Sequence, residues 1–188
     1  MTAHEASKLI RLAREDLASA QYMMGAAYFK GDGITPSQVT AVKWWRNAAD
    51  AGNARAQYEM GASYYEGTGV KKDKGKAAYW FRKAAEQGHV DAEYMLARAY
   101  DTAEGVPHNI AEAVRFYKKA ANHGHPTAQQ VLGSIYMSGD GVYVDHTQAI
   151  RWWRRAAAQG DTTAQSLLDD SISAFTKPKG RSRSMDPM

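Results

Sequence analysis

Apolar residues recur along the 188-residue chain at the spacing of helical faces. Ala56, Met60, Gly61 and Tyr64 stand at i, i+4, i+5 and i+8, so they share one stripe of a helix. Gly67 follows where this helix must end, because glycine readily adopts the left-handed conformation of a helix C-terminus. The pattern therefore predicts a short amphipathic helix that ends before Gly67.

A second helix is predicted to begin after Asp73, a residue that is favoured as an N-cap. The equivalent positions elsewhere also hold N-cap residues: Ser37, Asn109 and Asp145. Glu112 and Gln148 follow the last two of these by three residues, which resembles a capping box. The apolar stripe of the second helix consists of Ala77, Trp80, Phe81, Ala84 and Ala85. Its alanines allow close helix approach, and its aromatic side chains are expected to fill the space between units.

This helix pair repeats with a period of 36 residues, which is the sequence signature of a solenoid. Each unit carries the same markers in the same register, and the clearest are a tyrosine (Tyr28, Tyr64, Tyr100, Tyr136) and an aromatic pair (Trp44-Trp45, Trp80-Phe81, Phe116-Tyr117, Trp152-Trp153). The period divides the chain into four units: 17–52, 53–88, 89–124 and 125–160.

The two ends of the chain align with parts of the repeat and are predicted to be capping helices. Residues 1–16 contain a degenerate second helix, with Leu9 at the aromatic position and Ala13 at an alanine position. Residues 161–175 align with a lone first helix, in which Asp169 replaces a glycine. Three residues of that helix are expected to face inward: Ala164, Leu168 and Ile172. Residues 176–188 are expected to be a disordered basic tail.

The repeated pattern A-x-x-x-L-G-x-x-Y-x-x-G-x-G-V, then D-x-x-x-A and W-[WFY]-x-x-A-A-x-x-G, resembles the Sel1-like repeat, a relative of the tetratricopeptide repeat. The resemblance covers about residues 17–160. It implies an all-α protein, a right-handed α/α superhelical solenoid of four Sel1-like helix-pair repeats with a capping helix at each end. Ala97 replaces a glycine and Ala103 replaces the first loop glycine, so the turn of the third unit is expected to be the least regular.

The same resemblance implies a concave groove lined by the first helices, which would hold a peptide or a helix of a partner protein. The groove positions, transferred from tetratricopeptide repeats, are Ser19, Tyr22, Ala26, Phe29, Arg55, Tyr58, Ala62, Tyr65, Asp91, Tyr94, Arg98, Asp101, Thr127, Gln130, Ser134 and Met137. Six of them are candidate partner-binding residues: Tyr22, Phe29, Tyr58, Tyr65, Tyr94 and Arg98. Two alternatives stay open: the tyrosines could simply pack against their neighbours, and Arg98 could pair with Asp101 instead of a ligand carboxylate.

The net charge of +4 would suggest nucleic acid, but most of it lies at the C-terminus. Residues 177–188 hold four basic residues and one acidic residue, while the remaining body holds twenty basic and nineteen acidic residues. A nucleic-acid partner is therefore not expected. Two basic clusters in the body are interpreted as solvated outer faces: Lys71, Lys72, Lys74 and Lys76, and Arg151, Arg154 and Arg155.

No feature of the sequence indicates catalysis, a metal or another cofactor. The chain has no cysteine, which excludes thiolate sites and weakens any likeness to the cysteine-rich, β-lactam-binding members of the family. His89, His123 and His125 lie in turns, where histidine can cap a helix, and they lack the spacing of metal ligands. The G-x-G sequences follow helices and lack the third glycine of a nucleotide-binding loop.

We therefore expect a non-enzymatic scaffold or adaptor that binds another protein in its concave groove and acts as a monomer. The alternative is a regulatory subunit or an exported host-interaction factor that binds through the convex face, with a β-lactam-binding type of enzyme a distant third. No stretch approaches the roughly 20 apolar residues that membrane insertion requires. The N-terminus lacks an apolar leader, so a cytoplasmic location is expected, or export if the chain is a processed fragment.

Overall fold

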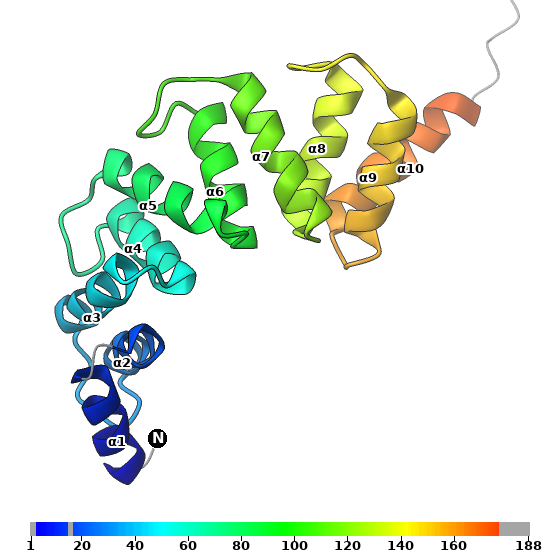
Figure 1. The fold of residues 1–188 in the computed structure, drawn as a ribbon. Helices are drawn as coiled ribbons and strands as arrows, with labels where there is room; N and C mark the ends of the chain where they lie inside the picture. Colours follow the sequence, from blue (N-terminus) through cyan, green and yellow to red (C-terminus); the bar gives the residue numbers. More distant parts are fainter. Residues whose placement is uncertain (1–2, 15–16, 177–188) are drawn as a thin grey trace, which may run out of the picture.

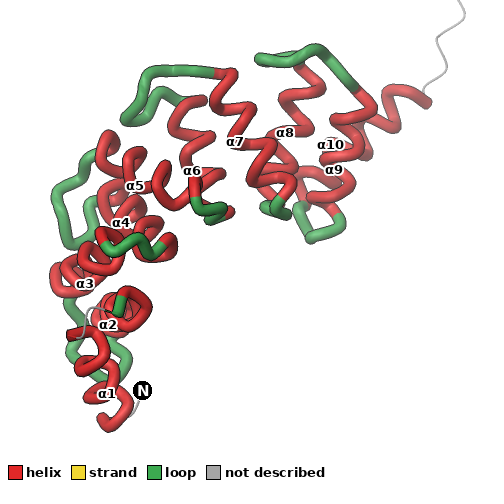
Figure 2. Tube along the Cα trace, viewed as in Figure 1, coloured by secondary structure: helices red, strands yellow, loops and turns green. Residues whose placement is uncertain are grey.

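The chain forms a row of antiparallel helix pairs along an arch (Figure 1). The computed structural model describes residues 3–14 and 17–176, and within them it contains helices and loops but no strand (Figure 2). The helices are α1 (Ala3–Arg14), α2 (Ala18–Lys30), α3 (Gln38–Asp50), α4 (Ala54–Glu66), α5 (Lys74–Glu86), α6 (Val90–Asp101), α7 (Ile110–Asn122), α8 (Pro126–Ser138), α9 (His146–Ala157) and α10 (Thr162–Thr176). Each helix packs against the helices that precede and follow it, so the predicted all-α solenoid is confirmed.

The N-caps within each unit are the residues that the sequence predicts. The side chains of Ser37, Asp73, Asn109 and Asp145 accept hydrogen bonds from the backbone N–H groups three residues later, at 2.9 to 3.2 Å. The expected capping boxes are wrong in their second half. The N–H groups of Asn109 and Asp145 donate to the carbonyls of Tyr100 and Tyr136. These N–H groups are therefore not free to donate to the side chains of Glu112 and Gln148. This backbone bond ties each loop to the repeated tyrosine.

The turns between units are closed by a second set of caps. Asn53 and Asp161 each use a side-chain oxygen to accept from the N–H three residues on, while His89 and His125 use Nδ1. The expected capping role of histidine is therefore confirmed at His89 and His125, but not at His123, whose Nδ1 lies 2.7 Å from the Glu93 carboxylate. Gly88, just before one of these caps, has a φ of +79°, which explains the repeated glycine.

Close approach between the two helices of a pair depends on a glycine in the first helix. A Cβ added at Gly61 would lie 2.5 Å from the ring of Phe81, and one at Gly25 would lie 2.3 Å from Trp45. The aromatic ring of the second helix therefore lies directly on the backbone of the first helix. In the third unit the buried Ala97 takes this position.

The capping helices agree with the sequence except at one residue. Leu9 of α1 packs on the Ala20–Met24 cluster, and Ala164 and Leu168 of α10 are buried. Ile172, however, is 46% exposed, so its predicted inward orientation is wrong. It stands one period after Tyr136, where a following second helix would cover it, and no second helix follows in the described chain. The side chain of Ala13 and residues 177–188 of the tail lie outside the described part.

The loop after α6 departs only slightly from its equivalents: α6 ends one residue earlier, and Ala103 takes the left-handed conformation of the glycines at the equivalent positions. Ala103 has a φ of +58° and is the one non-glycine residue with positive φ in the described chain. The next residue, Glu104, turns back toward the preceding unit and contacts Tyr65 and Lys74. This loop is thus held by side chains from two units.

Candidate functional site on the first helices

Tyr58 of α4 lies between two aromatic side chains. Its ring stacks on His89 with centroids 4.7 Å apart and an interplanar angle of 11°, and it is tilted against Phe81 at 5.8 Å. Tyr94 of α6 repeats the arrangement one unit later, stacking on His125 at 4.4 Å. The tyrosines of successive units therefore contact the histidine caps between them instead of one another.

Both histidines are held in the form that such a cap needs. Burial lowers the pKa of His89 and of His125, and the carboxylate of Asp91 counteracts this only in part. A neutral ring keeps the Nδ1 lone pair available to the backbone N–H of the next helix. Burial also raises the pKa of Tyr58 and of Tyr22, so their hydroxyls remain hydrogen-bond donors at neutral pH.

Tyr65 and Arg98 belong to a charged network that joins the second and third units. The Tyr65 hydroxyl donates to a Glu104 carboxylate oxygen at 2.8 Å, and Lys74 Nζ lies 3.2 Å from the same oxygen. Lys74 Nζ also lies 3.0 Å from the centre of the Tyr65 ring, and Arg98 donates to the Tyr65 hydroxyl at 3.4 Å. The bond from Tyr65 and the charge of Lys74 lower the pKa of Glu104, which keeps it ionised.

Arg98 does not take up the local pairing that the sequence left open. Asp101 instead accepts a hydrogen bond from the Tyr117 hydroxyl at 3.1 Å, and no ion pair joins it to Arg98 among the described residues. Burial disfavours the charged form of Arg98, but the interactions with Tyr94 and Tyr65 outweigh this effect and raise the pKa of Arg98. Its guanidinium lies 5.9 Å from the Tyr94 ring centre, which places a fixed positive charge among the tyrosines.

The first two units bring predicted groove residues to one surface hollow. Ser19, Tyr22 and Arg55 line this hollow of about 450 Å³ together with Met23, Asn53 and Ala54. Phe29 is exposed beside Trp45, with ring centroids 5.3 Å apart. Ser19 and Met23 also line a larger hollow of about 750 Å³ between α1 and α2.

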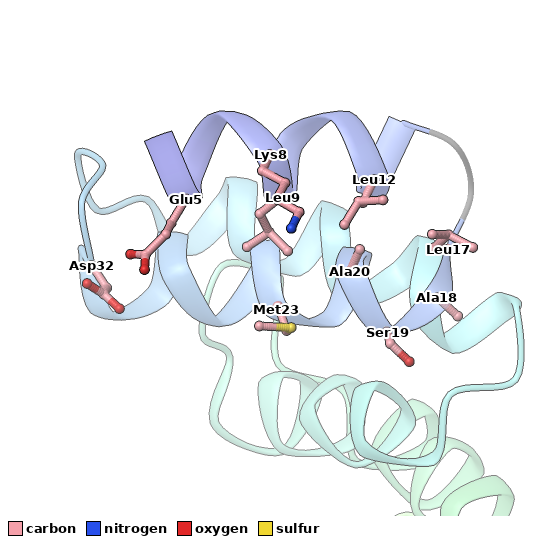
Figure 3. A pocket seen from close by; sticks show the side chains of 10 residues that line it. All are labelled: Glu5, Lys8, Leu9, Leu12, Leu17, Ala18, Ser19, Ala20, Met23 and Asp32. Carbon is pink, nitrogen blue, oxygen red and sulfur yellow. The ribbon is translucent and has the colours of Figure 1, made fainter. Parts of the chain in front are cut away.

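This larger hollow is mainly apolar (Figure 3). Leu9 and Leu12 point from α1 toward α2, Leu17 lies at one end, and Glu5 and Asp32 lie at the other. Leu12, Leu17 and Met23 are not among the binding residues predicted from the sequence. Leu17 and Met23 are exposed apolar residues that line the same hollow, which is a signal of a contact surface.

The described residues contain no cluster of three or more potential metal ligands. Within the same residues, no helix has the length and apolar character needed to cross a bilayer.

Comparison with protein families identifies the repeat. The Sel1 repeat family model matches residues 18–53, 54–89, 90–125 and 126–161. The chain belongs to the Sel1 repeat family. Proteins built from Sel1 repeats generally act as non-catalytic scaffolds for protein–protein interaction. No curated protein sequence matches the chain.

Two solved Sel1 repeat structures from bacteria are similar over most of the chain. A protective antigen of uropathogenic Escherichia coli strains is 34% identical with a TM-score of 0.87, covering 90% of this chain and 36% of the antigen. A Sel1 repeat protein of Oxalobacter formigenes is 36% identical with a TM-score of 0.81, covering 87% of this chain and 68% of that protein. The cysteine-rich protein B of Helicobacter pylori shares the fold, at 22% identity and a TM-score of 0.55 over 68% of this chain and 96% of its own length.

The second and fourth units share a buried polar pair, and different residues occupy the same positions in the third unit. Gln57 and Gln129 are buried, and each donates to a carbonyl at the end of the preceding second helix. Each also accepts a hydrogen bond from the glutamine 30 residues later, Gln87 or Gln159. The third unit has Glu93 and His123 at these positions, with Nδ1 2.7 Å from the carboxylate. A neutral amide pair is thus replaced by an acid and a histidine.

Proposed function

We propose that this Sel1 repeat protein is an adaptor that binds a peptide or a helix of a partner protein along the exposed side of its first helices. The binding surface runs from the apolar hollow at α1 and α2, past Tyr22 and Arg55, to Tyr58, Tyr94 and Arg98. A partner segment with an apolar side chain at one end and carboxylates further along fits this order.

The observation that carries the proposal is the half-buried state of the tyrosines. Phe81 and His89 fix the orientation of the Tyr58 ring, and the ring nevertheless keeps part of its surface open. An aromatic ring that is already immobilised loses little entropy when a partner covers it, which is typical of interface anchors. Packing against neighbours and binding a partner are therefore compatible roles for the same side chain.

Arg55 and Arg98 place positive charges at two points along the proposed surface. Arg55 lies beside Tyr22 at the shared hollow, and Arg98 lies over Tyr94 one unit beyond Tyr58. A guanidinium next to an aromatic ring can bind a carboxylate in a bidentate manner while the ring contacts the adjoining methylene groups.

The test is site-specific photo-crosslinking in cells. A photoreactive amino acid at Ala26 or at Ala62, both on the proposed surface, should capture a partner that the same group at Ala111 on α7 does not capture. The captured protein is then purified, and its affinity is measured for wild type and for a Tyr58→Ala, Tyr94→Ala variant. Tyr79→Ala is the matched control, because Tyr79 is an exposed tyrosine of α5.

The double variant should bind at least about tenfold more weakly, and the control should bind within twofold of wild type. Circular dichroism must show that the double variant is folded, since both rings also pack on neighbours. If the folded double variant binds as well as wild type, or if only Ala111 crosslinks, the proposed surface is wrong.

A further inference from the structure

The second helices carry a basic surface that the net charge conceals. Three positions of each second helix point outward in register, and ten of these twelve positions are lysine or arginine. The columns are 43, 79, 115 and 151; 46, 82, 118 and 154; and 47, 83, 119 and 155, with Tyr79 and Asn47 the two exceptions. Most of these side chains are exposed, and none of the twelve is acidic.

The fold separates charge between its two helix layers. Helices α3, α5, α7 and α9 contain twelve basic and three acidic residues, whereas α2, α4, α6, α8 and α10 contain three basic and seven acidic residues. The folded body is therefore nearly neutral only because the charges of the two layers offset each other. Its second-helix layer is strongly positive, and this layer attracts acidic partners at a distance.

Part of this charge has a structural role between units. Arg46 and Arg82 donate hydrogen bonds to the hydroxyls of Tyr64 and Tyr100, each in the next unit. Lys118 lies 5.3 Å from the ring centre of Tyr136 in the same relation. Packing on a tyrosine of the next unit thus explains the basic residues at 46, 82 and 118, but not the one at 154.

Helix α9 breaks this relation. The residue one period after Tyr136 is Ile172, so Arg154 has no tyrosine of a next unit to contact. Arg151, Arg154 and Arg155 are all exposed, and none of them forms an ion pair within the described chain. Arg155 lies 4.7 Å from the ring centre of Trp152, which orients its guanidinium.

The three arginines surround a hollow on the outer side of α9. Its volume is about 420 Å³, and its other lining residues are Thr147 and Ile150. Arg151 and Arg155 are one helical turn apart, so their guanidinium groups can pair with two acidic side chains spaced by about 5 to 6 Å. Ile150 supplies an apolar contact between the charges.

We propose that this face of α9, which we call the arginine hollow, is a second binding site that takes an acidic segment of a partner protein. The segment presents two carboxylates about one helical turn apart with an apolar side chain between them. The site is on the opposite helix layer from the proposed groove, so the protein can hold two protein segments at once. Arginine suits this role because its planar guanidinium binds carboxylates in a bidentate manner.

An acidic protein segment fits better than nucleic acid. A phosphate backbone gains little from Ile150, whereas an apolar side chain between two carboxylates contacts it directly. The neighbouring α7 is also unsuited to a continuous row of phosphates, because Glu112 holds Arg115 in hydrogen bonds of 2.7 to 3.2 Å. An uninterrupted basic track is what non-specific phosphate binding uses.

The test measures fluorescence anisotropy of a labelled peptide that repeats Glu-Glu-Leu, titrated with the full chain at low and at physiological salt. The triple variant Arg151→Glu, Arg154→Glu, Arg155→Glu should bind the peptide at least about tenfold more weakly than wild type. The variant Lys71→Glu, Lys72→Glu, Lys76→Glu makes the same change in net charge elsewhere and should stay within threefold. A peptide with Gln in place of Glu should not bind.

Three results would overturn the proposal. The first is an equal loss of affinity in the lysine variant, which would show an effect of total charge only. The second is tighter binding of a labelled oligothymidine than of the peptide with the same sensitivity to the arginine changes, which would make the hollow a nucleic-acid site. The third is unchanged binding by the arginine variant. If that variant is not folded, Arg151→Gln, Arg154→Gln, Arg155→Gln replaces it.

The double Tyr58→Ala, Tyr94→Ala variant separates this site from the proposed groove. It should bind the acidic peptide as wild type does. Loss of peptide binding in that variant would place the peptide on the first helices and would contradict the arginine hollow.

Discussion

Replacing His123 with alanine removes the imidazole whose Nδ1 lies 2.7 Å from the Glu93 carboxylate. Glu93 is 1% exposed, so water cannot easily replace the lost partner, whereas the His123 side chain is 49% exposed. The units on either side have glutamine pairs at these positions, which are neutral whether or not they are hydrogen-bonded. Removing the hydrogen-bond partner of the buried residue should therefore lower the stability most in the third unit.

The size of the effect follows from the burial of the two groups. Removing one partner of a fully buried ion pair destabilises a protein by about 3–5 kcal/mol. A hydrogen bond to a charged group contributes about 1.5–3 kcal/mol. Because His123 is half-exposed, its removal admits some water to Glu93, and we expect His123→Ala to lower the free energy of unfolding by about 2 kcal/mol. This corresponds to a Tm lowered by about 4–8 °C for a chain of this length.

Urea unfolding followed by far-ultraviolet circular dichroism measures the effect, with the m-value showing whether the transition keeps its cooperativity. Gln87→Ala in the second unit is the matched control and should cost only about 1 kcal/mol, since it breaks a neutral hydrogen bond. The variant Glu93→Gln, His123→Gln rebuilds the pair of the neighbouring units and should stay within about 1 kcal/mol of wild type. The expected role of His123 is contradicted if His123→Ala changes the free energy of unfolding by less than about 0.5 kcal/mol, or if the rebuilt pair is as unstable as His123→Ala.

Three further predictions follow from the packing and the caps. Gly61→Leu should destabilise the protein by about 3 kcal/mol or more in the same urea assay, because even the added Cβ would lie 2.5 Å from the Phe81 ring. A stable variant would show that the helix pair can separate. Ala103→Gly should stabilise it by about 0.5–1 kcal/mol by relieving a φ of +58°, and a loss of stability would mean that the turn is not strained. The lowered pKa of His89 and His125 means that their contribution to stability is present above their ordinary pKa of about 6.5 and is lost as pH falls. The Tm should therefore drop between pH 7.5 and 5.5, and the variant His89→Asn, His125→Asn should drop less, since asparagine caps without titrating.

The repeat made most of the fold predictable from the sequence. A side chain that recurs every 36 residues must occupy the same place in each unit, so one cap at Asp73 predicts those at Ser37, Asn109 and Asp145. The same reasoning failed at Ile172, because equivalence in sequence does not supply the neighbouring helix that covers the position. It also failed for the capping boxes, where a backbone carbonyl competes for the same N–H.

The site was less predictable because its contacts join positions that do not repeat together. The network of Tyr65, Lys74 and Glu104 occurs at one junction only, since the equivalents of Glu104 are Asp32, Thr68 and Asp140 and the equivalents of Lys74 are Gln38, Ile110 and His146. No periodic signal marks such a combination. The basic columns of the second helices were, by contrast, visible in the sequence, but only once residues were compared at a fixed register instead of along the chain.

The separation of charge has a consequence for how a small solenoid can act as a scaffold. Each unit contributes one helix to each of the two layers. Substitutions in the first helix therefore change one surface without affecting the other. The first helices of this chain have become acidic and aromatic, while the second helices have become basic. Two partner segments can therefore be selected independently, and the rigid stacking of successive pairs fixes the distance between them. A variant that loses one partner should keep the other, which distinguishes a two-sided adaptor from a protein with a single binding surface.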